Sequence, residues 1–177
     1  RSTDKLRLGR AKLFTDGAIQ GFTAKLLPPG YFSGEDCGIW NMEVDHFNAA
    51  VMALHKAGVK THIHTNGDAA SAFATESIAA AMRSHPGADL RHTLEHVQLA
   101  DRAQFQRMHA LGICVNVFAN HLYYFGDIHW TRTLGPDRAS RMDACADALE
   151  VFGGNFAIHS DAPVTPMAPL FTTWCAV

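Results

Sequence analysis

Short strand-like stretches and helical patterns alternate along this chain, and this alternation limits the folds that it can adopt. Five stretches rich in apolar or β-branched residues recur, at residues 10–17, 59–68, 90–98, 113–118 and 155–161. Helical spacing of apolar residues predicts helices over 42–58, 68–85, 101–112 and 142–152. Strand–helix alternation is typical of a parallel sheet with right-handed crossovers and outer helices. We therefore predict one α/β domain over residues 1–177.

Two architectures are compatible with this alternation: an open doubly wound sheet, or part of a (β/α)8 TIM-type barrel. A full barrel takes about 250 residues, so five units in a chain of 177 residues would form an incomplete one. The sequence has neither the GxGxxG fingerprint of a dinucleotide-binding fold nor a P-loop. These absences favour the incomplete barrel. The segment 119–138 reads as a polar and aromatic loop, and Pro163, Pro166 and Pro169 are expected to prevent regular structure just after the last strand.

The composition excludes several classes of partner. The net charge is −2 and the pI is near 6.6, which gives no electrostatic reason to expect nucleic acid or an anionic membrane. No apolar run reaches the roughly 18 residues that a membrane span needs. The four cysteines are scattered and indicate neither a disulfide framework nor a zinc knuckle. The compartment is left open, with a cytoplasmic location favoured, and the expected partner is a small-molecule substrate.

Polar side chains gather where the predicted strands end. In KTHIHTNGD, His62 and His64 share one face of a strand, which fits a metal site, a proton-transfer site or surface decoration. Because the active site of a parallel α/β fold lies at the carboxyl ends of its strands, the other strand ends matter equally. Histidine and carboxylate side chains there are the ligands of zinc-like ions. The residues at these ends are Asp16, His64, Glu95, His96, Asn120, His121, His159 and Asp161, and Lys12 lies within the first strand.

Four motifs in the same order carry a family resemblance. KLFTDG, HTNGD, RHTLEHVQ and IHSDAPV resemble the motifs of strands four, five, six and eight in the amidohydrolase superfamily. The chain is most similar to its third subfamily, which includes N-substituted formamide deformylases and proteins described as exoenzyme regulators. The resemblance covers about residues 8–177. It implies the strands four to eight of the barrel and a metal-dependent hydrolase of amide-type, non-peptide C–N bonds.

The resemblance also implies roles for individual residues. His64, His96 and Asp161 match metal ligands, and Asp161 matches the catalytic base for the attacking water. Lys12 matches a lysine that is often carboxylated and then bridges two metals, so we expect one or two divalent ions of the zinc type. Loops at the catalytic end could shape a substrate pocket, with Asn66, His121 and Tyr124 as candidates. Other histidines are expected to have different roles: His62 and His92 packing or supporting a ligand, and His46, His55, His85 and His109 solvated on helices.

One departure from the family pattern concerns its strand-one His-x-His pair. Nothing here precedes the strand-four motif, and the HIH at 62–64 belongs to the strand-five motif. We therefore expect a piece of a longer protein, impaired as an isolated enzyme, that self-associates or pairs with the missing part. An alternative is a non-catalytic scaffold or regulatory homologue that binds a small molecule or partner. A second alternative is an open-sheet binding domain that does not use metal.

Overall fold

Five parallel strands form a single sheet in a computed structural model that describes residues 3–6, 9–34, 38–87 and 89–177. Their order in space, β1-β2-β3-β4-β5, is also their order along the chain, and each pair of neighbours is parallel. This arrangement is an arc of consecutive barrel strands and confirms the predicted α/β class. The strands are β1 (Arg10–Phe14), β2 (Lys60–Thr65), β3 (Thr93–His96), β4 (Cys114–Val117) and β5 (Ala157–Ile158).

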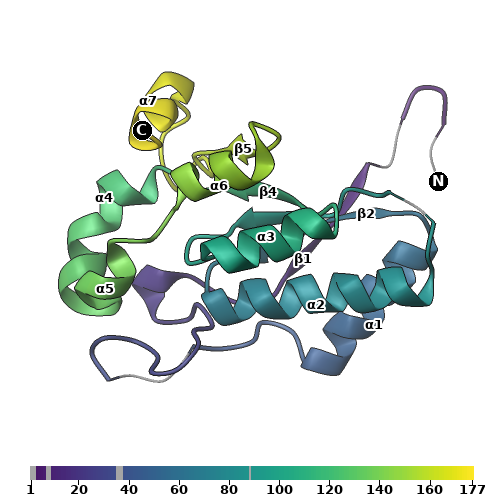
Figure 1. Cartoon of the computed structure of the whole chain (residues 1–177), viewed down its shortest axis with the longest axis horizontal. Coiled ribbons are helices and arrows are strands. Elements are labelled where there is room, and N and C mark those ends of the chain that lie inside the picture. The colour runs from purple at the N-terminus through teal and green to yellow at the C-terminus, as the bar shows by residue number, and fades with distance from the viewer. Residues whose placement is uncertain (1–2, 7–8, 35–37, 88) are drawn as a thin grey trace.

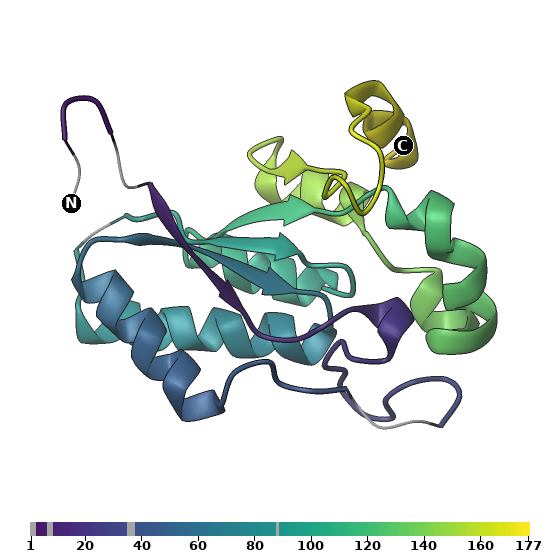
Figure 2. The same cartoon turned by 180° about the vertical axis from the view of Figure 1, so that it is seen from behind.

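The helices between the strands cover one face of the sheet. They are α1 (Val44–Lys56), α2 (Asp68–Ser84), α3 (Arg102–Ala110) and α6 (Cys145–Phe152). In Figure 1, α2 and α3 lie in front of the sheet, and Figure 2 shows the opposite face of the sheet from behind. Among the described residues that opposite face carries no helix layer, so it corresponds to the interior of the barrel.

Side chains along β2 alternate between the helix-covered face of the sheet and the opposite face. Ile63 is fully buried and joins the main apolar core against the helices, whereas His62 and His64 are half-buried on the other face. The prediction that the two histidines share a face is therefore confirmed. The core contains large side chains from every layer, including Phe47, Val51, Ile78, Leu94, Phe105, Met108 and Phe152.

The segment after β4 is helical, and its prediction as a loop was wrong. It forms α4 (His121–Ile128), the π-helical η2 (His129–Thr133) and α5 (Gly135–Ala139). Histidines at the starts of α4 and η2 turn inward, and the Nδ1 of His129 lies 2.8 Å from the Oγ1 of Thr133 one turn later. Polarity thus suggested a loop, while these side chains are in fact buried within a folded helical segment.

The last part of the chain also differs from the prediction. Only Ala157–Ile158 forms a strand in β5, and a helix, α7 (Pro169–Cys175), follows the proline-rich turn. Pro169 occupies the first helical turn, where the missing N–H costs nothing. This proline therefore begins a helix rather than preventing one.

The first turns of α2 and α3 are stabilised differently. Asp101 accepts from the backbone N–H of Gln104, and the side-chain oxygen of Gln104 accepts from the backbone N–H of Asp101, so α3 begins with a capping box. The N-cap of α2 is Gly67, so no side chain caps this helix. The carboxylate of Asp68, the first residue of α2, accepts from the backbone N–H of Leu27 at 2.8 Å and pairs with Arg138 at 3.1 Å.

A second apolar cluster fixes the long connection between β1 and α1 at the carboxyl end of the sheet. It joins that connection, including η1 (Ile19–Gly21), to the segment 134–142. The same connection passes so close to the turn after β2 that a Cβ added at Gly67 would lie 1.8 Å from the carbonyl oxygen of Lys25. The glycine of the NGD motif is therefore required by this contact. The cluster comprises Ile19, Ala24, Leu26, Tyr31, Leu134, Ala139 and Met142.

Two histidines that were assigned to the solvated surface have different environments. His46 and His109 are exposed as expected. His55 is only 4% exposed, and its Nδ1 lies 3.0 Å from the Nε2 of His92. Its other nitrogen contacts the carbonyl oxygen of His85 at 3.0 Å, and that residue is half-buried. The prediction that His55 lies on a helix is confirmed. The prediction that it is solvated was wrong, because it lies on the buried face of α1.

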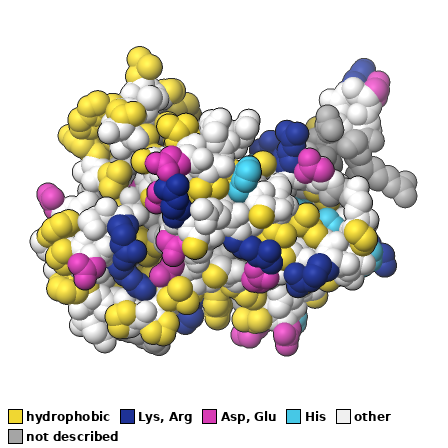
Figure 3. Space-filling view, viewed as in Figure 1, with side chains coloured by type: hydrophobic (Ala, Val, Ile, Leu, Met, Phe, Trp, Pro, Cys, Tyr) yellow, Lys and Arg dark blue, Asp and Glu magenta, His cyan; other side chains and the backbone are white. Residues whose placement is uncertain are grey.

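Aromatic side chains of α4 and α7 form an exposed apolar cluster, which we call the α4–α7 cluster. Tyr123 contacts both Phe171 and Trp174, with ring centroids 5.0 and 5.9 Å apart. Figure 3 shows hydrophobic side chains gathered over this corner of the molecule. Across the described residues, no helix is both long and apolar enough to cross a membrane.

Candidate metal centre

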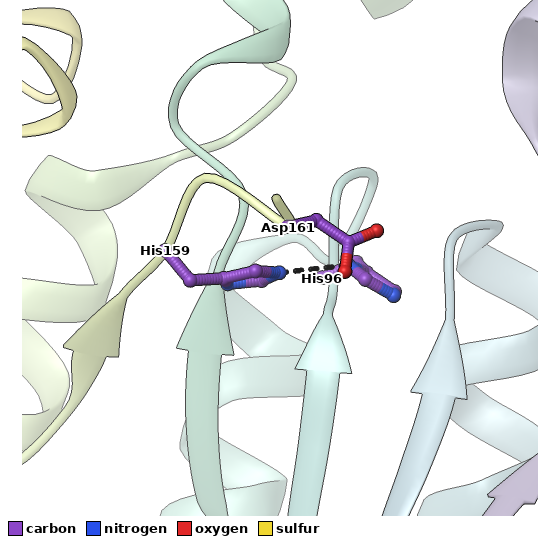
Figure 4. A group of neighbouring side chains, drawn as sticks. All are labelled: His96, His159 and Asp161. Carbon is purple, nitrogen blue, oxygen red and sulfur yellow. Dashed lines mark hydrogen bonds between the residues drawn. The ribbon is translucent and has the colours of Figure 1, made fainter. Parts of the chain in front are cut away.

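Three potential metal-ligating side chains converge at the carboxyl end of the sheet. His96 comes from β3, and His159 and Asp161 follow β5 (Figure 4). One ligand atom from each lies within 4.8 Å of those of the other two. The Nδ1 of His96 is 2.9 Å from the Nε2 of His159. Two imidazoles and one carboxylate offer the N, N, O donor set of a catalytic zinc-type site.

The backbone at the end of β3 explains the position of His96. Leu94 points into the core against the helices, so strict alternation would place His96 on that face too. The chain instead becomes left-handed at His96, with φ 73°, and at Val97, with φ 43°. This conformation ends the strand, and the His96 ring contacts that of His64 with centroids 4.5 Å apart.

His64 lies next to the three-residue group, and its ring contacts the loop that follows β1. Its Nε2 lies 3.0 Å from the carbonyl oxygen of Gly17 and 3.1 Å from the amide nitrogen of Asn66. In the tautomer with the proton on Nε2, this nitrogen donates to the Gly17 carbonyl. The Nδ1 then has a free lone pair. Histidines that bind metals almost always donate their other ring N–H to a carbonyl or carboxylate in this way. The environment of His64 therefore fits a metal ligand.

Asp16 and Asn66 organise the turn that holds His64. The carboxylate of Asp16 is fully buried and accepts from the backbone N–H groups of Lys25, Asn66 and Gly67, at 2.8, 3.0 and 2.8 Å. The Asn66 side chain donates to the carbonyl of Gly17 at 2.7 Å. Asn66 was predicted as a substrate-binding residue, and the structure places it, buried, where it supports His64.

The buried histidines are held in the neutral form that binds metal. Burial lowers the pKa of His96, and the neighbouring His64 and His159 lower it further. Burial also lowers the pKa of His159, although Glu95 and Asp161 act in the opposite direction. Because a metal ligand must be deprotonated, these shifts favour metal binding at neutral pH.

Lys12 lies on the interior face of the sheet but outside the three-residue group. It is exposed on β1, opposite His62 in the strand register, and its Nζ is 5.2 Å from the centroid of the Phe14 ring. Its positive charge lowers the pKa of His96, which indicates that the amine is near the centre. Its role as a carboxylated ligand remains a prediction.

His62 lies below the centre on the same interior face. Its Nδ1 contacts the carboxylate of Glu95, and the Asn116 side chain donates to the second oxygen of that carboxylate at 2.7 Å. Glu95 is itself buried. His62 is therefore tied to a buried polar layer beneath His64 and His96, in keeping with its expected supporting role.

The structure separates the other two substrate-site candidates. His121 is 2% exposed, and its ring packs on Phe118 with centroids 3.9 Å apart. Phe118 also stacks on His159 at 4.9 Å, so His121 is one ring away from the centre. Tyr124 lies in the exposed α4–α7 cluster, where its ring contacts Phe171.

Sequence reasoning noted His159 at a strand end without assigning it a role. The signal was present in IHSDAPV, where His159 and Asp161 are two residues apart. Such a spacing allows both side chains to leave a strand on one face. The structure brings His159 together with His96 and Asp161.

Comparisons of sequence identify relatives along the whole chain. A sequence model of the amidohydrolase family matches residues 1–177. The chain is 27% identical over 174 residues to the putative amidohydrolase YtcJ of Bacillus subtilis, covering 97% of this chain and 32% of that protein. It is 26% identical over 172 residues to the protein LONG AFTER FAR-RED 3 of Arabidopsis thaliana, covering 97% of this chain and 29% of that one. The chain thus spans about a third of the length of these curated relatives.

Comparisons of structure give the same fold. An uncharacterized metal-dependent hydrolase from Pyrococcus furiosus matches with a TM-score of 0.83 and 21% identity, over 100% of this chain and 36% of that chain. A second such hydrolase, from Pyrococcus horikoshii, matches with a TM-score of 0.82 and 22% identity, over 100% of this chain and 34% of that one. These likenesses confirm the predicted fold class.

Proposed function

The chain belongs to the amidohydrolase family, and from this premise we propose that it forms part of a metal-dependent hydrolase of amide-type, non-peptide C–N bonds. The observation that supports this most strongly is the meeting of His96, His159 and Asp161 beside His64. The names of relatives agree with the proposal, since one is a putative amidohydrolase and two structural neighbours are metal-dependent hydrolases.

The donor set suits one or two divalent ions of the zinc type. Such an ion, when bound, polarises a scissile carbonyl and activates water for attack. His64, His96 and His159 offer imidazole nitrogen atoms from three different strand ends. A carboxylated Lys12 would add an oxygen ligand on the interior face, opposite His62 in register.

Asp161 is the proposed acid–base group. It is exposed, so water and substrate can reach its carboxylate, and it lies within the three-residue group. We assign it the removal of a proton from the attacking water and the delivery of that proton to the leaving nitrogen. The buried histidines are less suited to this task because burial keeps them neutral.

Metal content tests the first half of the proposal. Elemental analysis of the purified chain after exposure to zinc is expected to show about one bound ion or more per chain. A His64→Ala/His96→Ala double variant is expected to lose it, whereas a His46→Ala/His109→Ala double variant removes two exposed histidines and should retain it. Equal metal in all three proteins, or none in any, would contradict a zinc centre in this chain.

Hydrolysis tests the second half. The zinc-loaded chain is incubated with a panel of N-substituted formamides, acetamides and ureas, and released amine is measured. Asp161→Asn is expected to lower kcat by about 10²- to 10⁴-fold, as is usual for loss of a positioned acid–base group. An Asp161→Asn variant with full activity would argue against the assignment.

The sheet edges and the α4–α7 cluster lead to a proposal about assembly. In the described residues, β1 pairs only with β2 and β5 only with β4. Open edges and exposed aromatic surface favour association. We expect sedimentation velocity to show species larger than one chain, and a concentration-independent monomer would contradict this.

A further inference from the structure

Four hydrogen-bonded groups form a chain at the amino end of the sheet, away from the candidate metal centre. The backbone N–H of Thr61 donates to the Nδ1 of His92 at 3.2 Å, and the Nε2 of His92 lies 3.0 Å from the Nδ1 of His55. The Nε2 of His55 in turn lies 3.0 Å from the carbonyl oxygen of His85. We call these contacts the His55–His92 chain. It joins β2, the start of β3 and the ends of α1 and α2.

Both ends of the His55–His92 chain require the same arrangement of protons. A backbone N–H only donates, so the N–H of Thr61 requires a lone pair on the Nδ1 of His92, whose ring proton then lies on Nε2. A carbonyl oxygen only accepts, so His85 requires a proton on the Nε2 of His55. The Nδ1 of a neutral His55 is then the acceptor for the N–H of His92. The Thr61 hydroxyl, 2.7 Å from the Nδ1 of His92, can donate to the same lone pair.

This arrangement leaves no place for an additional proton. A proton on the Nδ1 of His92 would point at the N–H of Thr61, and a proton on the Nδ1 of His55 would point at the N–H of His92. Water cannot solvate either cation in place, because His55 and His92 are only 4% and 3% exposed. Both rings therefore stay neutral as long as the chain of hydrogen bonds is closed.

The surrounding charges also disfavour a cation. Burial lowers the pKa of His92, and its partner ring and Lys60 of β2 lower it further. His85, at the end of α2, brings a third imidazole and no negative charge. Asp89 pairs with Arg91 on the surface, at 3.5 Å. Across the described residues, neither ring of the pair has an ion pair with a carboxylate.

We propose that the His55–His92 chain is a pH-sensitive switch: with both rings neutral it holds the end of α1 on the amino ends of β2 and β3, and an added proton opens it. The opening is local, because the ends of elements open at a lower free energy than a core does. The apolar contacts of α1 through Phe47 and Val51 lie at least one turn further along the helix and remain. The proposed hydrolase activity uses the other end of the sheet and is a separate matter.

Acid favours the open form of the switch. In the open form an imidazole is hydrated and titrates near its usual pKa of about 6.5. The closed form binds the additional proton less readily, so the equilibrium constant for opening rises as the pH falls below this value. For one proton, the rise between pH 6 and pH 5 is about five- to tenfold.

A rival arrangement of protons makes a different prediction. If the Nδ1 of His92 donated to the hydroxyl of Thr61, the Nε2 of His92 would need a donor in His55. His55 would then carry protons on both nitrogens, since its Nε2 also faces a carbonyl oxygen. The rival is therefore a buried His55 cation at neutral pH, which acid would not open.

The first experiment is ¹⁵N NMR of the imidazole rings of the metal-free chain at pH 7. Each ring is assigned from the signal that disappears in His55→Gln or in His92→Gln. We expect the neutral Nε2–H tautomer in both rings. A charged His55, or a proton on the Nδ1 of either ring, would overturn the proposal.

The second experiment is hydrogen exchange of the Thr61 amide, which is released when the switch opens. After correction for the intrinsic exchange rate, its opening constant should rise about five- to tenfold from pH 6 to pH 5 and should depend little on low urea. The amide of Ile78, in the middle of α2, reports global unfolding and should exchange more slowly, with a strong dependence on urea. Equal opening constants and equal urea dependence at the two amides would rule out a local switch.

His92→Gln keeps a side chain that can accept and donate hydrogen bonds but does not titrate. The pH dependence of Thr61 exchange should disappear in this variant and persist in His109→Gln, since His109 is exposed. A pH dependence that His92→Gln leaves unchanged would contradict the proposal. If His92→Gln does not fold, the tautomers and the Thr61 exchange of the wild type decide the matter. None of these measurements needs bound metal, so they are independent of the metal-content test.

Discussion

The Nδ1 of His96 lies 2.9 Å from the Nε2 of His159, although the two residues are 63 positions apart in the chain. At this distance the two nitrogens share at most one proton, since two N–H groups cannot point at each other. A cation that replaces this proton would be held by both rings and by Asp161. The first prediction follows from this geometry.

His159→Ala is expected to lower zinc affinity by at least about tenfold, the usual lower limit for loss of a group that binds or orients a metal ligand. Competition with a chromogenic chelator measures the affinity. His109→Ala, on the exposed face of α3, is the matched control and should bind zinc as the wild type does. Equal zinc affinity in His159→Ala and His109→Ala would show that His159 is not a metal ligand.

The buried pair of His55 and His92 predicts a loss of stability in mild acid. Burial, with smaller contributions from His55 and Lys60, lowers the pKa of His92 from 6.5 to about 4. The folded state therefore binds this proton less readily than the unfolded state. The free energy of unfolding should fall as the pH drops from 6.5 towards 4 and should not recover below it. From pH 7 to pH 5 this residue contributes a loss on the order of 1 kcal/mol.

Urea titrations at pH 7 and pH 5 measure this effect. In His92→Gln the difference between the two pH values should be smaller than in the wild type, even if the variant is less stable at pH 7. His109→Gln provides the control because His109 is exposed. An unchanged pH difference in His92→Gln would mean that His92 is not the group that titrates.

A third prediction compares two glycine-to-alanine changes. A Cβ at Gly67 would meet the carbonyl of Lys25 at 1.8 Å, so Gly67→Ala must displace the β1–α1 connection from the turn that holds His64. We expect a loss of about 2 kcal/mol in the free energy of unfolding, as for other overpacking changes. Gly126 lies within α4 with nothing within 4 Å of an added Cβ. Gly126→Ala should therefore be stabilising by up to about 1 kcal/mol. A loss of similar size in both variants would contradict the contact.

The fourth prediction concerns Arg138, which ties α5 to the β1–α1 connection. Its guanidinium donates to the carbonyls of Gly30 and Leu27, at 3.0 and 2.8 Å, as well as to Asp68. Arg138→Met keeps the length of the side chain and removes these donors. Tryptic cleavage after Lys25 should become at least about tenfold faster, which corresponds to about 1.4 kcal/mol of local stability.

Arg141→Met is the control for this change, since among the described residues the Nε of Arg141 donates only to the carbonyl of Asp137, four positions earlier. Its cleavage rate should match that of the wild type. A comparable increase in the cleavage rate of both variants would show that the local stability of the β1–α1 connection depends on overall positive charge rather than on the Arg138 hydrogen bonds.

The sequence allowed the sheet, its direction and most of its helices to be predicted, because apolar periodicity reflects the two faces of each element. It also indicated His64, His96 and Asp161, through motifs at strand ends. His159 lacked a role because proximity to His96 depends on the pairing of β4 with β5 and on the left-handed turn after β3. Neither feature has a local sequence signature.

Other errors have a similar origin. The helices after β4 were read as a loop because polarity outweighed the inward orientation of His121 and His129. His55 was assigned to the surface because its partner, His92, comes 37 residues later. In both cases a polar side chain is buried only because another segment supplies its contact.

Because spatial order in the sheet equals chain order, every strand pairs with the strand made just before it. During synthesis, β2 could dock on β1 as soon as it left the ribosome, and each later strand would meet an edge already in place. Such a sheet needs no late insertion of a strand between two others. The chain could therefore grow one strand–helix unit at a time, with His159 and Asp161 the last to reach the centre.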